Sequence, residues 1–297
     1  MNRIQIKALG KVNLGLDVVR KREDGYHEVR MIMQTVQLFD KVTIEKRKQN
    51  NITMKTNLPF LPVNENNIGW KAARMLMDEF NIESGLHIDI EKHIPVAAGM
   101  AGGSTDGAAV LYGVNRLFGL GLTNRQLMER SVKLGADVPF CLMRGTVLSE
   151  GIGELLTPTA PLPNCHILIA KPPISVSTKY VYEHLKLDEI TRHPDIDGML
   201  EALKAGSLQG VAERMENVLE TVTIPKHPEI EKIKQVMMDE GALNAMMSGS
   251  GPTVFGIFDD KDKGMHARDI LRAGTLARQV YLVKPFNIRK YGYKKNR

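Results

Sequence analysis

The sequence has little cysteine and no long hydrophobic run. Only two cysteines, Cys141 and Cys165, occur among its 297 residues. Both lie in apolar stretches, which favours reduced thiols in a protein core over a disulfide or a zinc site. The N-terminal residues lack the apolar core of a signal peptide, and no run approaches the length of a membrane span. We therefore expect a cytoplasmic protein with no membrane partner.

The sequence also has fewer acidic than basic residues. Lys and Arg number 40 and Asp and Glu 34, which gives a net charge of +6. A surface of this charge attracts anions such as nucleotides and phosphates. Part of the excess lies in the C-terminal run IRKYGYKKNR, which we interpret as a solvated end and not as an arm that binds nucleic acid. We expect no nucleic-acid partner and keep an RNA-binding module as the alternative of another class.

Length and composition predict a globular protein with two domains. The chain is longer than a typical single domain. Its hydrophobic content of 43% is close to the globular average, so a sizeable core needs no disulfides to stabilise it. Three prolines fall within the short segment TPTAPLPNC, which has the composition of a linker. We therefore divide the chain into residues 1–158 and 159–297.

Periodicity predicts the secondary structure of each half. Alternation with period two indicates strands near 3–8, 11–20, 29–37, 41–46, 51–56 and 86–92. Helices are predicted over 67–81, 104–118 and 123–135, the last with Thr123 as N-cap and Gly135 as its stop, and 145–156 is predicted as a hairpin turning at Gly151 and Gly153. In the second half we predict strands near 166–170, 243–247, 253–258 and 279–284 and helices near 178–186, 208–221, 228–240 and 262–273.

Glycine and alanine are concentrated in one stretch, PVAAGMAGGSTDGAAVL, residues 95–111. It has neither the Gly-Lys-Ser/Thr ending of a P-loop nor the G-x-G-x-x-G spacing of a dinucleotide fold. Backbone N–H groups grip a phosphate only where no side chain blocks its approach, and Gly99, Gly102 and Gly103 leave that face clear. The helix that follows adds free N–H groups and the positive end of its dipole. Ser104 and Thr105 supply hydroxyls suited to capping the helix, binding phosphate oxygens or touching a magnesium ion.

The order of residues in this stretch resembles the nucleotide-binding motif of the GHMP kinases, the superfamily named for galactokinase, homoserine kinase, mevalonate kinase and phosphomevalonate kinase. Pro95, the Gly-Met-Ala-Gly-Gly run and the Ser-Thr-Asp that follows stand in the order of that motif. The resemblance implies an ATP-dependent phosphotransferase that uses Mg²⁺, with Ser104 as the candidate metal ligand. The ATP-binding residues that it implies are Asn67, Ile68, Pro95, Val96, Ala97, Ala98, Gly99, Met100, Ala101, Gly102, Gly103, Ser104 and Thr105.

The resemblance also implies a two-domain α/β fold. The N-terminal domain is expected to be related to domain 2 of ribosomal protein S5, and the C-terminal domain to be ferredoxin-like. The order of predicted strands and helices agrees with this expectation but does not by itself establish it.

Lys11 and Asn13 are predicted to point together from one face of a strand. The residues between and after them alternate, so the opposite face is assigned to Val12, Leu14, Leu16 and Val18. The reactive lysine of the superfamily stands in a segment P-A-K-[IVL]-N, which LGKVN resembles, although Leu9 and Gly10 replace the proline and alanine. This departure concerns the backbone path before the lysine and not the lysine itself.

Asp137 lies in GADVPFCL, just before a proline. From the residues alone it is predicted as the N-cap of a short helix. The resemblance makes it the catalytic carboxylate, which takes the proton of the acceptor hydroxyl while Lys11 orients it and stabilises developing negative charge.

Several further segments, spanning residues 11–258, resemble one branch of the superfamily, whose acceptor is cytidine diphosphate linked to methylerythritol. They include KVNLGLDVVRKREDGYHEVRMIMQTV, GADVPFCLMRGTVLSEGIGE and MMSGSGPTVFGIF. The resemblance implies that Tyr26 and Tyr182 stack on the cytosine and that His27 reads its edge. It places Asn13 and Thr178 at the methylerythritol end.

The same resemblance implies that a second glycine loop, SGSGPTVF, closes on the substrate phosphates through Gly249, Ser250 and Gly251. From the residues alone this loop is a turn between strands, and Tyr26 covers the end of a hairpin.

We therefore expect ATP-dependent phosphorylation of the 2-hydroxyl of this cytidine-bearing alcohol, a step of non-mevalonate isoprenoid biosynthesis. The alternative within the superfamily is a kinase for another small alcohol, because only Tyr26, His27 and Tyr182 argue for cytidine. The partners expected are ATP and this small-molecule substrate, in a monomer or a homodimer.

Overall fold

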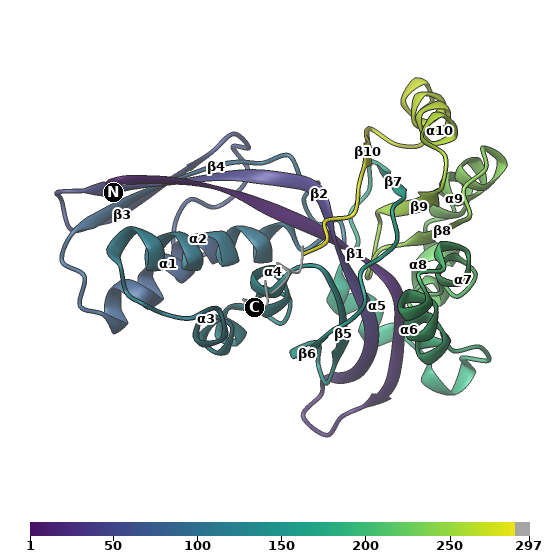
Figure 1. Ribbon diagram of the computed structural model, residues 1–297, viewed down its shortest axis with the longest axis horizontal. Coiled ribbons are helices and arrows are strands. Elements are labelled where there is room, and N and C mark those ends of the chain that lie inside the picture. The colour runs from purple at the N-terminus through teal and green to yellow at the C-terminus, as the bar shows by residue number, and fades with distance from the viewer. Residues whose placement is uncertain (289–297) are drawn as a thin grey trace, which may run out of the picture.

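The computed structural model describes residues 1–288 and has two sheets, each with helices packed against it (Figure 1). The basic run predicted as a solvated end lies outside the described residues except for its first residue, Ile288. Among the helices of the described residues, none has the length and apolarity needed to cross a membrane.

The larger sheet has six strands, β1 (Arg3–Lys21), β2 (His27–Arg47), β3 (Ile52–Thr56), β4 (Gly85–Glu91), β5 (Thr146–Glu150) and β6 (Leu155–Pro158). Their order is β3-β4-β2-β5-β6, with β1 paired to β2. Helices α1 (Ile68–Glu79) and α2 (Gly102–Phe118) lie together against one face of this sheet (Figure 1). Small residues on α2 permit this close packing, since a Cβ at Gly113 would lie 2.4 Å from Ile44.

Two predicted pairs of short strands, 3–8 with 11–20 and 29–37 with 41–46, are instead the single long strands β1 and β2. β1 and β2 pair along almost their whole length, with register shifts between Leu9 and Lys11, between Asn13 and Gly15, and between Val18 and Arg20. Such irregularities bend a strand without ending it. The first shift falls where the sequence departs from the superfamily pattern before the lysine.

The shift between Asn13 and Gly15 also corrects the predicted strand face. Val12 and Leu14 are buried in one hydrophobic cluster, whereas Leu16 and Val18 are buried in the other. A change of register redirects side chains relative to the sheet. The prediction that all four share one face was therefore wrong.

Most helix and hairpin predictions for the first half are confirmed. Asn67 caps α1, and Thr123 caps α3 (Asn124–Ser131) in a capping box with Gln126. A 3₁₀ turn, η1 (Val132–Leu134), follows and ends at Gly135, and β5 and β6 form the hairpin. A short helix, α4 (Val138–Met143), begins after Asp137.

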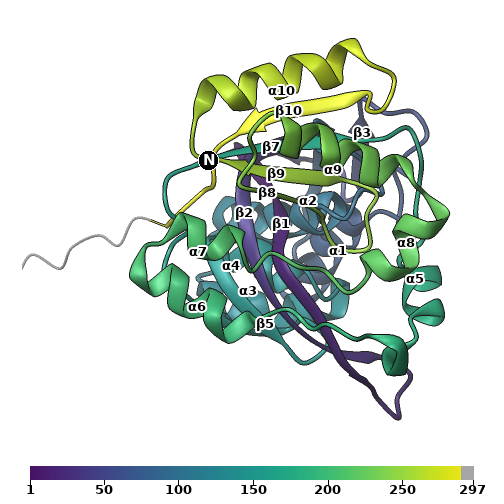
Figure 2. The same ribbon diagram turned by 90° about the vertical axis from the view of Figure 1, so that its right-hand side faces the viewer.

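The smaller sheet has the antiparallel order β10-β7-β9-β8. Its strands are β7 (His166–Lys171), β8 (Asn244–Met247), β9 (Val254–Phe258) and β10 (Gln279–Val283). Helices α9 (Glu229–Asp239) and α10 (Lys261–Ala273) pack against it (Figure 2). This order, with helices before β8 and between β9 and β10, is the ferredoxin-like arrangement.

Between β7 and α9 the chain forms α5 (Thr178–His184), a 3₁₀ turn η2 (Leu187–Glu189), α6 (Ile196–Ala205), α7 (Leu208–Ala212) and α8 (Glu220–Lys226). The single helix predicted over 208–221 was wrong, because α7 ends at Ala212 and the chain turns before α8. In this interruption Asn217 bonds to the backbone of other segments, which holds the turn in place. Helix α6 was not predicted.

The two halves of the chain meet along β1. The amide of Leu16 donates to the carbonyl of Glu216, and the amide of Val218 donates to the carbonyl of Leu16. Arg30 on β2 forms a bidentate pair with Asp197 on α6, with distances of 2.9 and 2.6 Å. These contacts fix the second half against the strand that carries Lys11.

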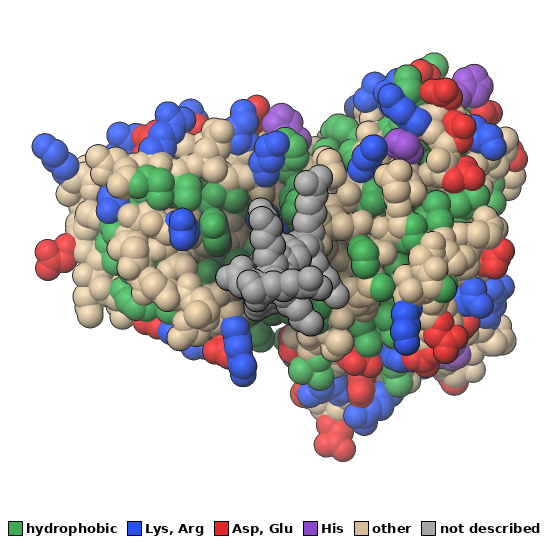
Figure 3. Space-filling view, in the orientation of Figure 1, with side chains coloured by type: hydrophobic (Ala, Val, Ile, Leu, Met, Phe, Trp, Pro, Cys, Tyr) green, Lys and Arg blue, Asp and Glu red, His purple; other side chains and the backbone are tan. Residues whose placement is uncertain are grey.

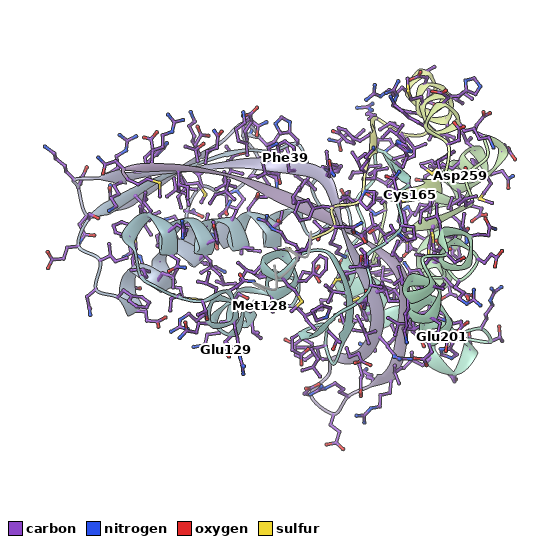
Figure 4. The ribbon with its side chains drawn as sticks, viewed as in Figure 1. Phe39, Met128, Glu129, Cys165, Glu201 and Asp259 are labelled. Atoms are coloured by element: carbon purple, nitrogen blue, oxygen red, sulfur yellow. The ribbon has the colours of Figure 1, made fainter. Side chains whose placement is uncertain are left out.

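The two cysteines are free and buried, as predicted; Figure 4 shows Cys165 just before β7. Side chains of both charge signs are interspersed over the face drawn in Figure 3, which gives the RNA-binding alternative no support on that face.

Candidate active site

A cavity of about 1060 Å³ lies between the glycine-rich stretch, the start of β2 and the loop before β9. It is lined by most of the residues predicted from the sequence: Lys11, Asn13, Tyr26, His27, Asn67, Ile68, Pro95, Val96, Ala97, Ala98, Gly99, Ala101, Gly102, Gly103, Ser104, Asp137, Thr178, Tyr182, Gly249 and Ser250. Met100, Thr105 and Gly251 are buried and do not line it.

The glycine-rich loop is held open toward this cavity by left-handed backbone. Positive φ angles occur at Ala97 (49°), Gly99 (70°) and Ala101 (55°). Helix α2 begins directly afterwards, and no side chain caps its first turn. The free N–H groups and the positive end of a 17-residue helix therefore face the cavity, which is the arrangement that binds phosphate.

Two residues of this glycine-rich stretch lie away from the cavity wall. The Thr105 hydroxyl donates to the carbonyl of Leu9 at 2.8 Å, and the carbonyl of Met100 accepts from the amide of Lys11 at 3.2 Å. Both groups tie the loop to β1, because buried polar groups require a partner. Of the two hydroxyls considered from the sequence, only that of Ser104 lies on the cavity wall.

Lys11, Asn13 and Asp137 converge at one end of the cavity. The Lys11 ammonium is buried, donates to Asn13 Oδ1 at 2.6 Å and lies 3.8 Å from Asp137 Oδ2. Asn13 in turn donates to the sulfur of Met31 at 3.1 Å. The predicted pointing of Lys11 and Asn13 to one side is therefore confirmed.

Asp137 stands at the N-cap position of α4, but its side chain caps no N–H group. The carboxylate is 30% exposed, so it is open to the cavity while it faces the buried ammonium. A carboxylate with free oxygens beside a fixed cation is suited to accepting a proton from a bound hydroxyl. The same carboxylate, together with burial, raises the pKa of the nearby Cys141 thiol.

Aromatic side chains lie at another part of the cavity wall. The rings of His27 and Tyr182 are 5.2 Å apart and tilted by 43°, so the structure pairs Tyr182 with His27, whereas Tyr26 is 60% exposed. Burial lowers the pKa of His27, and the nearby Lys21 ammonium lowers it further. Burial also raises the pKa of the Tyr182 phenol, as does Asp137.

The second glycine loop meets the first. Ser248 donates from its hydroxyl to the carbonyl of Gly99 at 3.0 Å, and the hydroxyls of Ser250 and Thr178 are 2.8 Å apart. Asn217 donates to the carbonyls of Met247 and Gly249 and thereby fixes the loop from behind. Asn217 carried no signal in the sequence, because its partners are 30 and 32 residues away.

The sequence reading also missed a buried charged cluster behind the glycine-rich loop. Lys92 bonds to Asp40 and to Asp106 Oδ2, the latter at 2.7 Å, and all three side chains are buried. Burial, opposed by Lys92 and assisted by Asp40, raises the pKa of Asp106 to about 8. Burial disfavours the Lys92 ammonium, but the two carboxylates outweigh this and raise its pKa. The sequence offered two signals, a lysine shortly before the loop and Asp106 as the last residue of the Ser-Thr-Asp in the motif.

Comparison with known proteins supports the resemblance. The family model described as GHMP kinases N terminal domain matches residues 67–145, and the one described as GHMP kinases C terminal matches residues 199–274. A 4-diphosphocytidyl-2-C-methyl-D-erythritol kinase of Lachnoclostridium phytofermentans is 56% identical over 96% of this chain and 98% of its own. One of Alkaliphilus oremlandii is 50% identical over 97% of this chain and 98% of its own.

Solved structures show the same fold. The crystal structure of a 4-(cytidine 5'-diphospho)-2C-methyl-D-erythritol kinase superposes with a TM-score of 0.82 at 29% identity, covering 96% of this chain and 100% of that chain. A homoserine kinase from Cytophaga hutchinsonii superposes with a TM-score of 0.75 at 19% identity over 96% of this chain and 94% of that one. The second likeness concerns the fold alone.

Proposed function

The chain belongs to the GHMP kinases and, among them, to the 4-diphosphocytidyl-2-C-methyl-D-erythritol kinases, and from this membership we propose its reaction. It transfers a phosphoryl group from ATP to the 2-hydroxyl of 4-(cytidine 5'-diphospho)-2-C-methyl-D-erythritol, which yields the 2-phosphate and ADP in non-mevalonate isoprenoid biosynthesis. The observation that carries this proposal is 56% identity over nearly the full length of such a kinase.

The residues at the Lys11 end of the cavity have the roles that this reaction requires. Asp137 takes the proton of the acceptor hydroxyl, since its oxygens are free and open to the cavity. Lys11 orients Asp137 and stabilises the developing alkoxide. Because phosphoryl transfer depends mainly on alignment and charge stabilisation, a buried, hydrogen-bonded lysine suits this task.

The glycine-rich loop and the start of α2 bind the phosphates of ATP, and Asn67 and Ile68 border its adenine. Support comes from the left-handed loop, the uncapped helix and the position of both residues on the same cavity wall. The free end of α2 favours negative charge.

The acceptor occupies the other part of the cavity. Tyr26 and Tyr182 contact the cytosine, His27 reads its edge, and Asn13 and Thr178 bind the methylerythritol. Support comes from their places along one cavity wall, with Asn13 beside Lys11 and His27 beside Tyr182. Gly249 and Ser250 reach the same space from the second glycine loop. Gly251 is buried, and it shapes the loop through its positive φ of 84° and through its amide, which donates to the carbonyl of Ser248 at 3.0 Å.

The donor atoms on this wall fit Mg²⁺. This ion prefers oxygen ligands and is held largely by nucleotide phosphates with few protein groups. Ser104 lies in the first turn of α2, and its hydroxyl has no hydrogen-bond partner among the described residues. Ser104 would hold the ion together with the phosphates, and the ion would neutralise charge on the transferred group.

The proposal is tested by an assay of ADP release with Mg²⁺, ATP and 4-(cytidine 5'-diphospho)-2-C-methyl-D-erythritol. Parallel reactions contain homoserine or mevalonate in its place. We expect turnover with the cytidine substrate only. Turnover with another alcohol would be consistent with the fold but would contradict the assignment of the cytidine pocket. A cytoplasmic location, a monomer or homodimer, and the lack of nucleic-acid and membrane partners remain predictions from the sequence.

A further inference from the structure

Lys92 lies three residues before Pro95, where the glycine-rich stretch begins, and like Asp106 it lines the same cavity as the loop. Its residue exposure is 8%, and those of Asp40 and Asp106 are 0% and 4%. Burying a charge is costly unless the charge serves as part of a pair or a site. Even a paired lysine loses hydration when it is buried, so a cluster of three ionisable side chains on the wall of this cavity points to a binding site.

The cluster joins three elements around the loop. Asp40 lies on β2, and its Oδ1 accepts from the amides of His93 and Ile94, at 2.5 and 2.8 Å. Asp106 lies in α2, just after the loop ends. Lys92 bonds to both carboxylates, so it links the point where the chain enters the loop to the helix where it leaves.

The ammonium also lies against the start of α2. A Cβ built on Gly102, the first residue of the helix, would be 3.3 Å from Lys92 Nζ. A lysine has three N–H donors, and two of them are taken by Asp40 and Asp106. The third has no acceptor among the described residues, and Lys92 faces the cavity.

We propose that Lys92 is a further residue that binds the phosphates of ATP, an inference that rests on the proposed function. Asp40 and Asp106 hold its buried ammonium behind the glycine-rich loop. The ammonium supplies positive charge and one N–H group to the phosphates. Charges act over longer distances in a protein interior than in water. Asp106 shares the ammonium with Asp40, and its Oδ1 is buried without a partner. A neutral amide at residue 106 would therefore keep an acceptor for Lys92 while Asp40 retains the charge pairing.

A purely structural role predicts different behaviour. If Lys92 only tied the loop to the helix, its loss would disturb the whole nucleotide site, adenine included. If Lys92 binds phosphates, its loss weakens the binding of ATP and leaves the binding of adenosine unchanged. The two ligands therefore separate the roles within one protein.

Three variants carry the test. Lys92→Met removes the charge and keeps an unbranched chain. Lys92→Met with Asp40→Asn also removes the carboxylate left unpaired, while the asparagine keeps an oxygen for the amides of His93 and Ile94. Asp106→Asn keeps an acceptor for Lys92 and places its NH₂ group where Oδ1 has no partner.

Binding of a non-hydrolysable ATP analogue and of adenosine is measured by calorimetry, without the alcohol substrate, alongside the melting temperature. We expect both Lys92 variants to bind the analogue about tenfold more weakly or worse, the loss typical of a charged hydrogen bond. Adenosine affinity should stay within about twofold, and Asp106→Asn should bind the analogue as tightly as the wild type or more tightly.

Recovery of wild-type analogue affinity in the double variant would overturn the proposal, because the single loss would then come from the unpaired Asp40. An equal loss for adenosine, or a tenfold loss in Asp106→Asn, would do the same. If Lys92→Met does not fold, the double variant and Asp106→Asn still test whether Lys92 binds the phosphates. A wild type that binds the analogue but does not phosphorylate the cytidine substrate would contradict the proposed function and leave this test intact.

Discussion

The carbonyl of Gly99 accepts a hydrogen bond from the hydroxyl of Ser248 at 3.0 Å, although the two residues stand in separate glycine loops 149 positions apart. Gly99 approaches so closely that a Cβ on it would lie 2.0 Å from the Ser248 carbonyl oxygen. This contact joins the glycine-rich loop at residues 95–103 to the loop before β9. The cavity therefore depends on a glycine for its shape as well as for phosphate access.

Gly99→Ala should lower the free energy of unfolding by about 1–3 kcal/mol and reduce activity, because the new methyl group meets backbone atoms at a positive φ. Denaturant unfolding measures the change. Gly103→Ala is the matched control, since its Cβ has only Ile68 at 3.5 Å nearby. The control should be as stable as the wild type or slightly more so; equal losses in both variants would contradict the clash.

Ser104 and Thr105 should respond oppositely to loss of their hydroxyls. Thr105→Val removes the bond to Leu9 and should lower the free energy of unfolding by about 1–3 kcal/mol with little effect on the KM for ATP. Ser104→Ala should raise the KM for ATP and the Mg²⁺ requirement at unchanged stability. Steady-state kinetics and thermal unfolding of both variants check this. A loss of stability in Ser104→Ala, with a raised KM for ATP in Thr105→Val, would assign the metal ligand to Thr105 instead.

Asp137→Asn should lower kcat by about 10²–10⁴-fold, because the amide cannot accept the proton of the acceptor hydroxyl. The carboxylate makes no capping bond, so the free energy of unfolding should change little. Binding of ATP, measured directly, should be retained. A variant that keeps kcat but loses ATP affinity would show that Asp137 serves nucleotide binding and not proton transfer.

The pH dependence of kcat/KM for the cytidine substrate should show the titration of the His27 imidazole. Burial and Lys21 lower its pKa below the ordinary 6.5, so the imidazole is neutral at pH 7. In the proposed pocket one ring nitrogen would then accept a hydrogen bond from the cytosine amino group. As the pH falls through this lowered pKa, the acceptor is lost and kcat/KM should decline. His27→Gln should lack this step; an identical profile in the variant would assign the step to another group.

Asp106 should make stability fall as the pH rises. Burial raises its pKa to about 8 in the folded protein, against an ordinary value of 3.8, so the folded state binds this proton more tightly. The stability that the proton contributes is complete below pH 3.8 and is lost as the pH rises toward 8. The difference in unfolding free energy, Asp106→Asn minus wild type, should therefore increase over this range. A constant difference would mean that Asp106 is ionised throughout.

Local sequence determined much of this protein. The glycine-rich loop, the cap at Thr123, the hairpin at Gly151 and the free cysteines follow from residue types and short spacing, and the structure confirms them. The family and its two-domain fold followed from several motifs in order, which the relatives and solved structures confirm. Such features depend on neighbours within a few positions, so a single sequence is enough to reveal them.

Only the tertiary structure decided which groups meet. The register shifts that divide the apolar residues of β1, the Thr105 bond to Leu9 and the pairing of His27 with Tyr182 each join segments distant in sequence. The buried contact of Lys92 with Asp40 spans 52 positions, and its two residues look like ordinary surface charges in the sequence. Burial and partner choice are properties of packing, because they depend on which surfaces the folded chain removes from water.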